Sequence, residues 1–228
     1  MSKRISLSLE PWGGKRRELS FEVGSLVCAG FAGRDTAKVR KHIEELRSFG
    51  VEPPARIPSF YRLAPYILTT DAENNSIEVK GRETSGEAEW IGLLSDELYV
   101  TIGSDHTDRK LEGQDIGLSK QICQKVISAK VWRYSDLQDH WDRLKITCWT
   151  LPRKNESLYQ VGEAKDILSP EDLIHKSKVR RGAVLFSGTY PTEAGKVVFA
   201  DRYEMKLEDP VLKRSISLSY GVIPLGDE

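Results

Sequence analysis

Three acidic residues have types and a spacing that would suit a metal ion. Glu87 and Glu89 lie two apart in a segment that we expect to be a strand, so period two points both carboxylates to the same face. Two like charges at that separation repel each other unless a cation lies between them. Asp105 follows the next apolar strand, 98–102, where a third carboxylate can reach its neighbours. The pattern indicates an all-oxygen site for a hard divalent ion, although an isolated Glu-x-Glu pair is typical of a solvated strand face.

A second pair of residues has the chemistry of a general base. His42 and Glu45 are three apart in an expected helix and are therefore neighbours on its surface. A carboxylate that orients an imidazole stabilises its charged form, so that the ring can take a proton from water near neutral pH. By itself, His-x-x-Glu also describes an exposed helical pair, and Glu44 is an alternative partner by spacing.

Other polar residues give weaker indications. His106, beside Asp105, is either another ligand or a hydrogen-bonded loop residue. Lys120 and Lys125 flank Cys123 and could anchor an anionic substrate, although most lysines are only solvated. The chain has neither the Gly-x-Ser-x-Gly motif of a nucleophilic serine nor a glycine-rich phosphate loop. The sequence therefore gives a serine hydrolase no support.

The elements that would position these side chains are mostly strands. Residues 5–27 alternate apolar and polar side chains and predict a hairpin. Residues 77–102 are rich in β-branched and aromatic residues and predict three short strands, and residues 183–224 look entirely β. The strongest helix is expected over 35–50, between a capping residue and a terminal glycine. This pattern predicts an α+β fold that is mostly β.

The composition limits the classes of partner. The chain has 228 residues, with 34 Lys and Arg against 34 Asp and Glu, so it lacks the basic excess that nucleic acids or acidic membranes attract. Its polar start and the lack of any long apolar run predict neither a signal peptide nor a membrane span, and we expect a cytoplasmic protein. Three scattered cysteines suggest neither a disulfide framework nor a thiolate zinc site.

In their order along the chain, several short motifs resemble those of the fumarylacetoacetate hydrolase superfamily. The chain is identified as a member of an uncharacterised branch of that superfamily, one labelled only as a domain of unknown function. The resemblance covers nearly everything after about residue 30. The segments that carry it are Gly33-Arg34-Asp35, His42-Ile43-Glu44-Glu45, Pro58-Ser59-Phe60-Tyr61-Arg62, Glu87-Ala88-Glu89, 103–109, Ser119-Lys120-Gln121, Tyr159-Gln160-Val161-Gly162 and 181–191. Within them, Arg62 stands where the family usually has Lys, and Tyr190 is inserted before Pro191.

This resemblance implies a fold and an assembly. It implies a mixed β-roll with few short helices, and members are usually homodimers. The whole chain, 1–228, would then be a single domain. Residues 1–30 would form an N-terminal β arm, 35–62 a helix with a lid-like segment, and 77–228 the core of the roll.

The resemblance also implies roles for individual residues. Glu87, Glu89 and Asp105 would hold Mg²⁺ or Mn²⁺. The dyad of His42 and Glu45 would activate water. The remaining groups would bind the carboxylate or the developing enolate of a small oxo-acid substrate, and they are Lys120, Arg62, Arg109 and Thr189.

Three functional hypotheses follow. The leading one is a metal-dependent hydrolase or lyase that cleaves a C–C bond in a 2-oxo or 1,3-dicarbonyl carboxylic acid, because a chelated metal stabilises the enolate that forms. The second is a decarboxylase or tautomerase of an oxaloacetate-like acid at the same ion. The third is a catalytically silent relative that binds a ligand in the same cavity.

Overall fold

The structure is a computed structural model that describes residues 3–48, 53–151 and 157–226. Strands predominate, as predicted. The first strands are β1 (Lys3–Leu9), β2 (Arg17–Val23), β3 (Ser25–Gly30), β4 (Ser59–Leu63), β5 (Leu68–Thr70), β6 (Ser76–Val79), β7 (Thr84–Ser85), β8 (Ala88–Leu94) and β9 (Leu98–Ser104). They continue with β10 (Thr107–Asp108), β11 (Lys125–Ile127), β12 (Lys130–Arg133), β13 (Lys145–Thr150), β14 (Ser157–Glu163), β15 (Ala183–Phe186), β16 (Arg202–Asp209) and β17 (Arg214–Pro224).

The helices are short, with one exception. They are α1 (Thr36–Ser48), α2 (Arg109–Glu112), α3 (Ile116–Gln121) and α4 (Pro170–Ser177), with the 3₁₀ turns η1 (Pro65–Ile67), η2 (Tyr134–Asp136), η3 (Gln138–Arg143) and η4 (Ala164–Asp166). The Asp35 side chain accepts hydrogen bonds from the backbone N–H groups of Ala37 and Lys38, which confirms the capped helix start. The predicted helix end at Gly50 lies outside the described residues.

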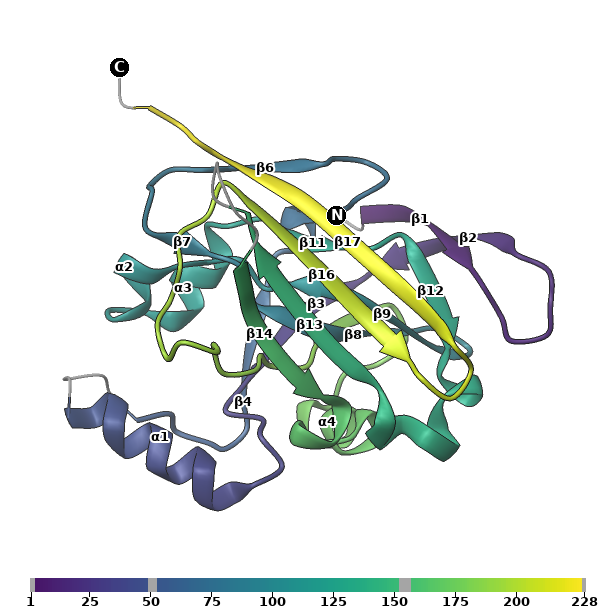
Figure 1. Cartoon of the computed structure of the whole chain (residues 1–228), viewed down its shortest axis with the longest axis horizontal. Coiled ribbons are helices and arrows are strands. Elements are labelled where there is room, and N and C mark those ends of the chain that lie inside the picture. Colours follow the sequence, from purple (N-terminus) through teal and green to yellow (C-terminus); the bar gives the residue numbers. More distant parts are fainter. Residues whose placement is uncertain (1–2, 49–52, 152–156, 227–228) are drawn as a thin grey trace.

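Two mixed sheets carry the fold (Figure 1). The larger has the order β2-β1-β12-β9-β8-β15-β3-β4, with β11 joining β9 to β5, and the smaller has the order β14-β13-β16-β17-β6. The predicted N-terminal hairpin forms as β1 paired with β2, and residues 77–102 contribute to four strands, β6 to β9, rather than three. The long strands β16 and β17 cross the front of the molecule, and α1 lies at its margin. This is the predicted mostly β roll.

Two cores lie on opposite faces of the larger sheet. On β8, Ala88 and Trp90 point into the core shared with the smaller sheet, where they join Tyr203 and Tyr220. Ile91 points the other way, into a second core. Most side chains of this second core come from strands of the larger sheet itself. A sheet that buries one of its faces against its own strands must curl. Because side chains alternate along a strand, Glu89 lies on the same face of β8 as Ile91.

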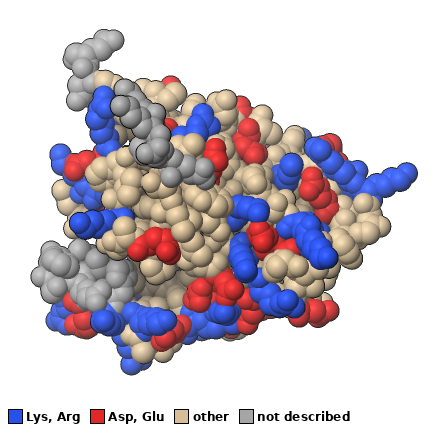
Figure 2. Space-filling model, viewed as in Figure 1, with Lys and Arg blue, Asp and Glu red and all other residues tan. Residues whose placement is uncertain are grey.

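The surface drawn in Figure 2 carries basic and acidic side chains interspersed with one another. This distribution matches a chain with equal numbers of basic and acidic residues. Among the described residues, no helix combines the length and the apolar character needed to cross a bilayer. The division of the chain into an arm, a lid-like segment and a core stays a prediction.

Candidate metal centre

The β8–β9 hairpin places the three predicted metal ligands. Glu87 directly precedes β8, Glu89 is its second residue, and Asp105 directly follows β9. Ala88 lies opposite Ser104 in the ladder, and the backbone N–H of Asp105 donates to the carbonyl of Glu87 at 3.0 Å. Glu87 and Asp105 are therefore cross-strand neighbours, and Glu89 is two residues further on the same face.

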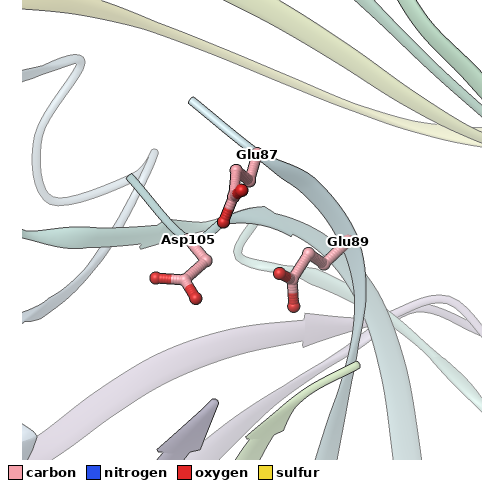
Figure 3. Close-up of side chains that lie close together, drawn as sticks. All are labelled: Glu87, Glu89 and Asp105. Carbon is pink, nitrogen blue, oxygen red and sulfur yellow. The ribbon is translucent and has the colours of Figure 1, made fainter. Parts of the chain in front are cut away.

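The three carboxylates converge (Figure 3). Each offers one oxygen, and these oxygens all lie within 4.8 Å of one another. Asp105 and Glu89 are 0% and 1% exposed, and Glu87 is also buried. Oxygens on opposite sides of a six-coordinate Mg²⁺ are about 4.2 Å apart, so this group has the right size for such an ion. The structure brings the three residues together, and their role as ligands stays a prediction.

Three cationic side chains surround two of these carboxylates. The Nζ of Lys120 lies 2.6 Å from Oδ2 of Asp105 and 3.2 Å from Oε2 of Glu87. The Nζ of Lys125 lies 2.8 Å from the other oxygen of Asp105, and Nη2 of Arg109 lies 3.0 Å from Oε1 of Glu87. Glu87 and Asp105 are thus paired at both of their oxygens.

The cations decide the ionisation of these two carboxyl groups. Burial alone would raise the pKa of Asp105, but Lys120 and Lys125 outweigh it and hold the pKa below its ordinary value. Burial likewise opposes ionisation of Glu87, and there Arg109 and Lys120 prevail and lower the pKa. Both groups are therefore carboxylates at neutral pH, the form that binds metal.

Glu89 has a different environment. No Lys, Arg or His of the described chain lies within ion-pair distance of it, and its Oε2 accepts a hydrogen bond of 2.8 Å from the backbone N–H of Gly188. Burial, together with the charges of Asp105 and Glu87, raises the pKa of Glu89 well above its ordinary value. Glu89 is therefore a buried carboxylate that has no cationic partner among the described residues and faces two further carboxylates, those of Glu87 and Asp105. Such an arrangement fits a hard divalent ion bound beside Glu89.

Two neighbouring elements deliver the lysines. Asp115 caps α3 by accepting from the N–H of Leu118, and the helix turns Lys120 inward, where it is buried. β11 pairs with β9 so that Val126 lies opposite Ser104, which places Lys125 beside Asp105. The sequence indicated Lys125 as one of the two lysines that flank Cys123. Its contact with Asp105, a predicted metal ligand, depends on strand register and was not predicted.

Arg109 is engaged by groups of its own chain. It begins α2, which Asp108 caps, and its Nε donates to Oγ of Ser85 at 2.6 Å. Its Nη1 lies 2.7 Å from Glu112 and its Nη2 contacts Glu87. In this structure Arg109 orients a predicted metal ligand, and its predicted contact with a substrate carboxylate stays a prediction.

Thr189 lies next to β8 through a network centred on Gln160. Gln160 accepts from the N–H of Ala88 at 2.9 Å and donates to Oγ1 of Thr189 at 2.8 Å and to the carbonyl of Tyr190 at 2.5 Å. Thr189 in turn donates to the carbonyl of Ala88 at 3.2 Å. The Thr189 loop is therefore fixed against the strand that carries Glu89.

The other predicted residues lie elsewhere. His42 and Glu45 are on α1, and their side chains lie outside what the structure describes. Arg62 is exposed on β4, while its neighbour Tyr61 packs against the second core, the one that Glu89 faces. Because adjacent residues of a strand point to opposite faces, the structure does not bring Arg62 to the carboxylates.

His106 is a buried hydrogen-bonded residue and not part of the carboxylate group. Its Nε2 is 2.9 Å from Oγ1 of Thr84, and its Nδ1 is 3.0 Å from the hydroxyl of Tyr220. Burial, with the nearby charges of Lys125 and Arg109, lowers the pKa of His106 well below its ordinary value, so the ring is neutral. The sequence left His106 as either another metal ligand or a hydrogen-bonded residue, and the structure favours the hydrogen-bonded residue.

A protein-family comparison identifies the chain. The family described as a protein of unknown function (DUF2848) matches residues 29–220. The chain belongs to the DUF2848 family. No curated protein matches it in sequence. The DUF2848 match agrees with the resemblance to a branch labelled only as a domain of unknown function.

Solved structures show which fold this DUF2848 chain has. A putative fumarylacetoacetate isomerase/hydrolase from Oleispira antarctica has a TM-score of 0.68 at 17% identity, over 95% of this chain and 99% of that one. A 2-hydroxyhepta-2,4-diene-1,7-dioate isomerase from Mycobacterium marinum has a TM-score of 0.64 at 13% identity, over 94% and 83%. The fold is that of fumarylacetoacetate hydrolase-type proteins, as the motifs predicted.

A third similar structure contains a metal. A 2-keto-3-deoxy-D-arabinonate dehydratase complexed with magnesium and 2,5-dioxopentanoate has a TM-score of 0.62 at 15% identity. The alignment covers 89% of this chain and 74% of the dehydratase. These three similar structures are thus a putative isomerase/hydrolase, an isomerase and a dehydratase, and the dehydratase is complexed with magnesium.

Proposed function

We propose that this protein is a divalent-metal-dependent enzyme that acts on a small 2-oxo or 1,3-dicarbonyl carboxylic acid and cleaves a C–C bond in it. The observation that carries the proposal is the buried group of Glu87, Glu89 and Asp105, in which only Glu89 lacks a described cationic partner. Mg²⁺ or Mn²⁺ in such a group supplies stabilisation of the enolate that develops when a bond next to the carbonyl breaks. The magnesium-bound dehydratase of the same fold supports this choice of ion.

Lys120 gives the site a fixed positive charge. Burial opposes its ionisation, but Asp105 and Glu87 outweigh burial and raise the pKa of Lys120 well above its ordinary value. An ammonium that keeps its proton is no general base, so we assign Lys120 to binding a carboxylate or an enolate oxygen. Thr189, held by Gln160, is a second candidate for that contact.

Hydrolysis needs a base that activates water, and we assign it to His42 with Glu45 on α1. A second candidate function is tautomerisation or decarboxylation at the same ion, which needs no activated water. The isomerase of the same fold supports tautomerisation.

The test is an assay of oxaloacetate and of an acylpyruvate, side by side, with Mg²⁺ and with EDTA. We expect magnesium-dependent turnover of the acylpyruvate that His42→Ala abolishes and that Lys38→Ala, an exposed change on the same helix, leaves unchanged. Turnover of oxaloacetate that survives His42→Ala would select the second function. The absence of metal-dependent turnover with either acid would contradict both functions and favour a silent relative.

A further inference from the structure

A second buried lysine, which the proposed reaction does not use, contacts the predicted metal ligand Asp105. Lys125 is the first residue of β11 and is fully buried. Its Nζ lies 2.8 Å from Oδ1 of Asp105 and also donates to the carbonyl of His106. Lys120 occupies the other oxygen, Oδ2, at 2.6 Å. Asp105 therefore shares both of its oxygens with ammonium groups.

The charges around the three carboxylates nearly balance without a metal ion. Glu87, Glu89 and Asp105 are matched in number by three cations, Lys120, Lys125 and Arg109, which contact Glu87 and Asp105 but not Glu89. Glu112 adds one more carboxylate on the outer side of Arg109. Four carboxylates and three cations leave one negative charge, so a divalent ion gives the loaded site a net charge of one positive unit.

The position of Lys125 makes that excess costly. Charges that are buried are poorly screened, so an ion that shares Asp105 with two ammonium groups is repelled by both. A bound anion beside the metal cancels the excess. Lys120 is accounted for as a substrate contact, whereas Lys125 is fully buried and its Nζ contacts only Asp105 and the carbonyl of His106 among the described residues, so we expect it to act on the ion through its charge.

We propose that Lys125 couples metal binding to the binding of an anionic ligand, so that the site takes up the divalent ion and a carboxylate-bearing 2-oxo acid together. The inference rests on the proposed function, because it concerns the same site. By reciprocity, the anion tightens the metal by the same factor by which the metal tightens the anion. The excess is one positive charge, so the single carboxylate of a 2-oxo acid is enough to cancel it.

The experiment measures Mn²⁺ affinity by calorimetry at pH 8, with and without oxalate, corrected for the manganese–oxalate complex in solution. We expect oxalate to tighten Mn²⁺ at least tenfold in the wild-type protein. Lys125→Met keeps the length of the side chain and removes its charge. It should tighten Mn²⁺ alone about tenfold and reduce the oxalate effect by a similar factor, within the usual range of coupling between two sites.

Two further variants secure the result. Lys130→Met makes the same change on the exposed side of β12 and should behave as wild type. Lys125→Gln, which keeps hydrogen-bond donors next to Asp105 and His106, replaces Lys125→Met if circular dichroism shows that the latter does not fold, and the same tightening is expected.

The outcomes separate the two proposals. Mn²⁺ that binds wild type and the Lys125 variants with equal affinity, or binds the variants more weakly, overturns the coupling and leaves the proposed function intact. An oxalate effect that is absent in wild type also overturns the coupling. A failure of Mn²⁺ to bind any of these proteins, with or without oxalate, overturns the proposed function as well.

Discussion

Glu87 and Glu89 are two residues apart and lie on the same face of the β8–β9 hairpin, yet their surroundings shift their pKa values in opposite directions. Arg109 and Lys120 lower the pKa of Glu87 against the effect of burial. Burial and the neighbouring carboxylates raise the pKa of Glu89. The two residues have the same chemistry, so the difference comes from their surroundings, and the cations beside Glu87 are its main cause.

This contrast predicts different costs for the same substitution. Glu87→Gln takes one charged partner from each of two buried cations, Arg109 and Lys120, and should lower the free energy of unfolding by about 3 kcal/mol. Arg109 keeps its ion pair with Glu112, and Lys120 keeps its ion pair with Asp105. Glu89→Gln removes a buried carboxyl that lacks a described cation, so in EDTA its stability should stay within about 1 kcal/mol of wild type. Urea unfolding measures both. Equal losses would contradict the assigned environments.

The same two variants serve to test metal binding. Mg²⁺ that binds only the folded protein raises its melting temperature. We expect Glu89→Gln to abolish the rise at millimolar Mg²⁺ although the protein remains folded, because it removes the carboxylate beside the proposed ion. Thermal unfolding with and without Mg²⁺ provides the measurement, and a full magnesium response in Glu89→Gln would place the ion elsewhere.

The raised pKa of Glu89 predicts how stability depends on pH. In the unfolded chain a glutamic acid loses its proton near pH 4.3, to within about a unit. Metal-free folded protein keeps that proton to higher pH, so it binds more protons than the unfolded chain above this value. The free energy of unfolding therefore falls as pH rises through this window.

The contribution of Glu89 is isolated by subtracting the free energy of unfolding of Glu89→Gln from that of wild type at each pH, because the other titrating groups are present in both proteins. Urea unfolding in EDTA between pH 5 and pH 7 should show wild type losing stability relative to Glu89→Gln as pH rises. A stability difference between the two proteins that is constant over this range would mean that Glu89 ionises normally in the folded state.

Gln160 should matter to stability because it satisfies buried backbone groups. Gln160→Leu leaves the N–H of Ala88 without its side-chain acceptor and removes the donor to Thr189. An unsatisfied buried group costs about 2 kcal/mol, which urea unfolding can detect. Val161→Ala, at an exposed neighbour on β14, should change stability by less than about 0.5 kcal/mol. Similar losses in both variants would contradict the special role of Gln160.

Gly162 should not tolerate a side chain. A Cβ there would lie 2.0 Å from Cδ1 of Tyr190, the residue inserted in the Thr189 turn. Tyr190 is buried, so it cannot move away freely, and Gly162→Ala should cost about 2 kcal/mol. Gly113→Ala is the matched control, because a Cβ at Gly113 meets nothing within 4 Å. A Gly162→Ala protein as stable as this control would show that the turn can relax.

The carboxylate group was predictable because local rules place it. Alternation along a strand sets Glu87 and Glu89 on one face, and a short antiparallel hairpin returns Asp105 to their side. These rules need only the sequence of one hairpin. The same holds for the capped start of α1, which depends on Asp35 and the next few residues.

The remainder of the site depends on pairing between distant segments. Lys125 reaches Asp105 only because β11 aligns Val126 with Ser104, and a shift by one residue would turn it to the other face. Arg62 illustrates the reverse case: the motif suggested a role in the site, but the register of β4 on β3 exposes it. Neither register can be read from a short motif.

The charged cluster around Asp105 also comes from one continuous part of the chain. Residues 85–112 supply the hairpin, Arg109 and Glu112, and the lysines follow at 120 and 125. The basic residues that neutralise this cluster are therefore synthesised shortly after the acidic residues Glu87 and Asp105. We expect this stretch to assemble early in folding, whereas Glu89 must wait for Gly188, almost a hundred positions later, to receive its backbone hydrogen bond.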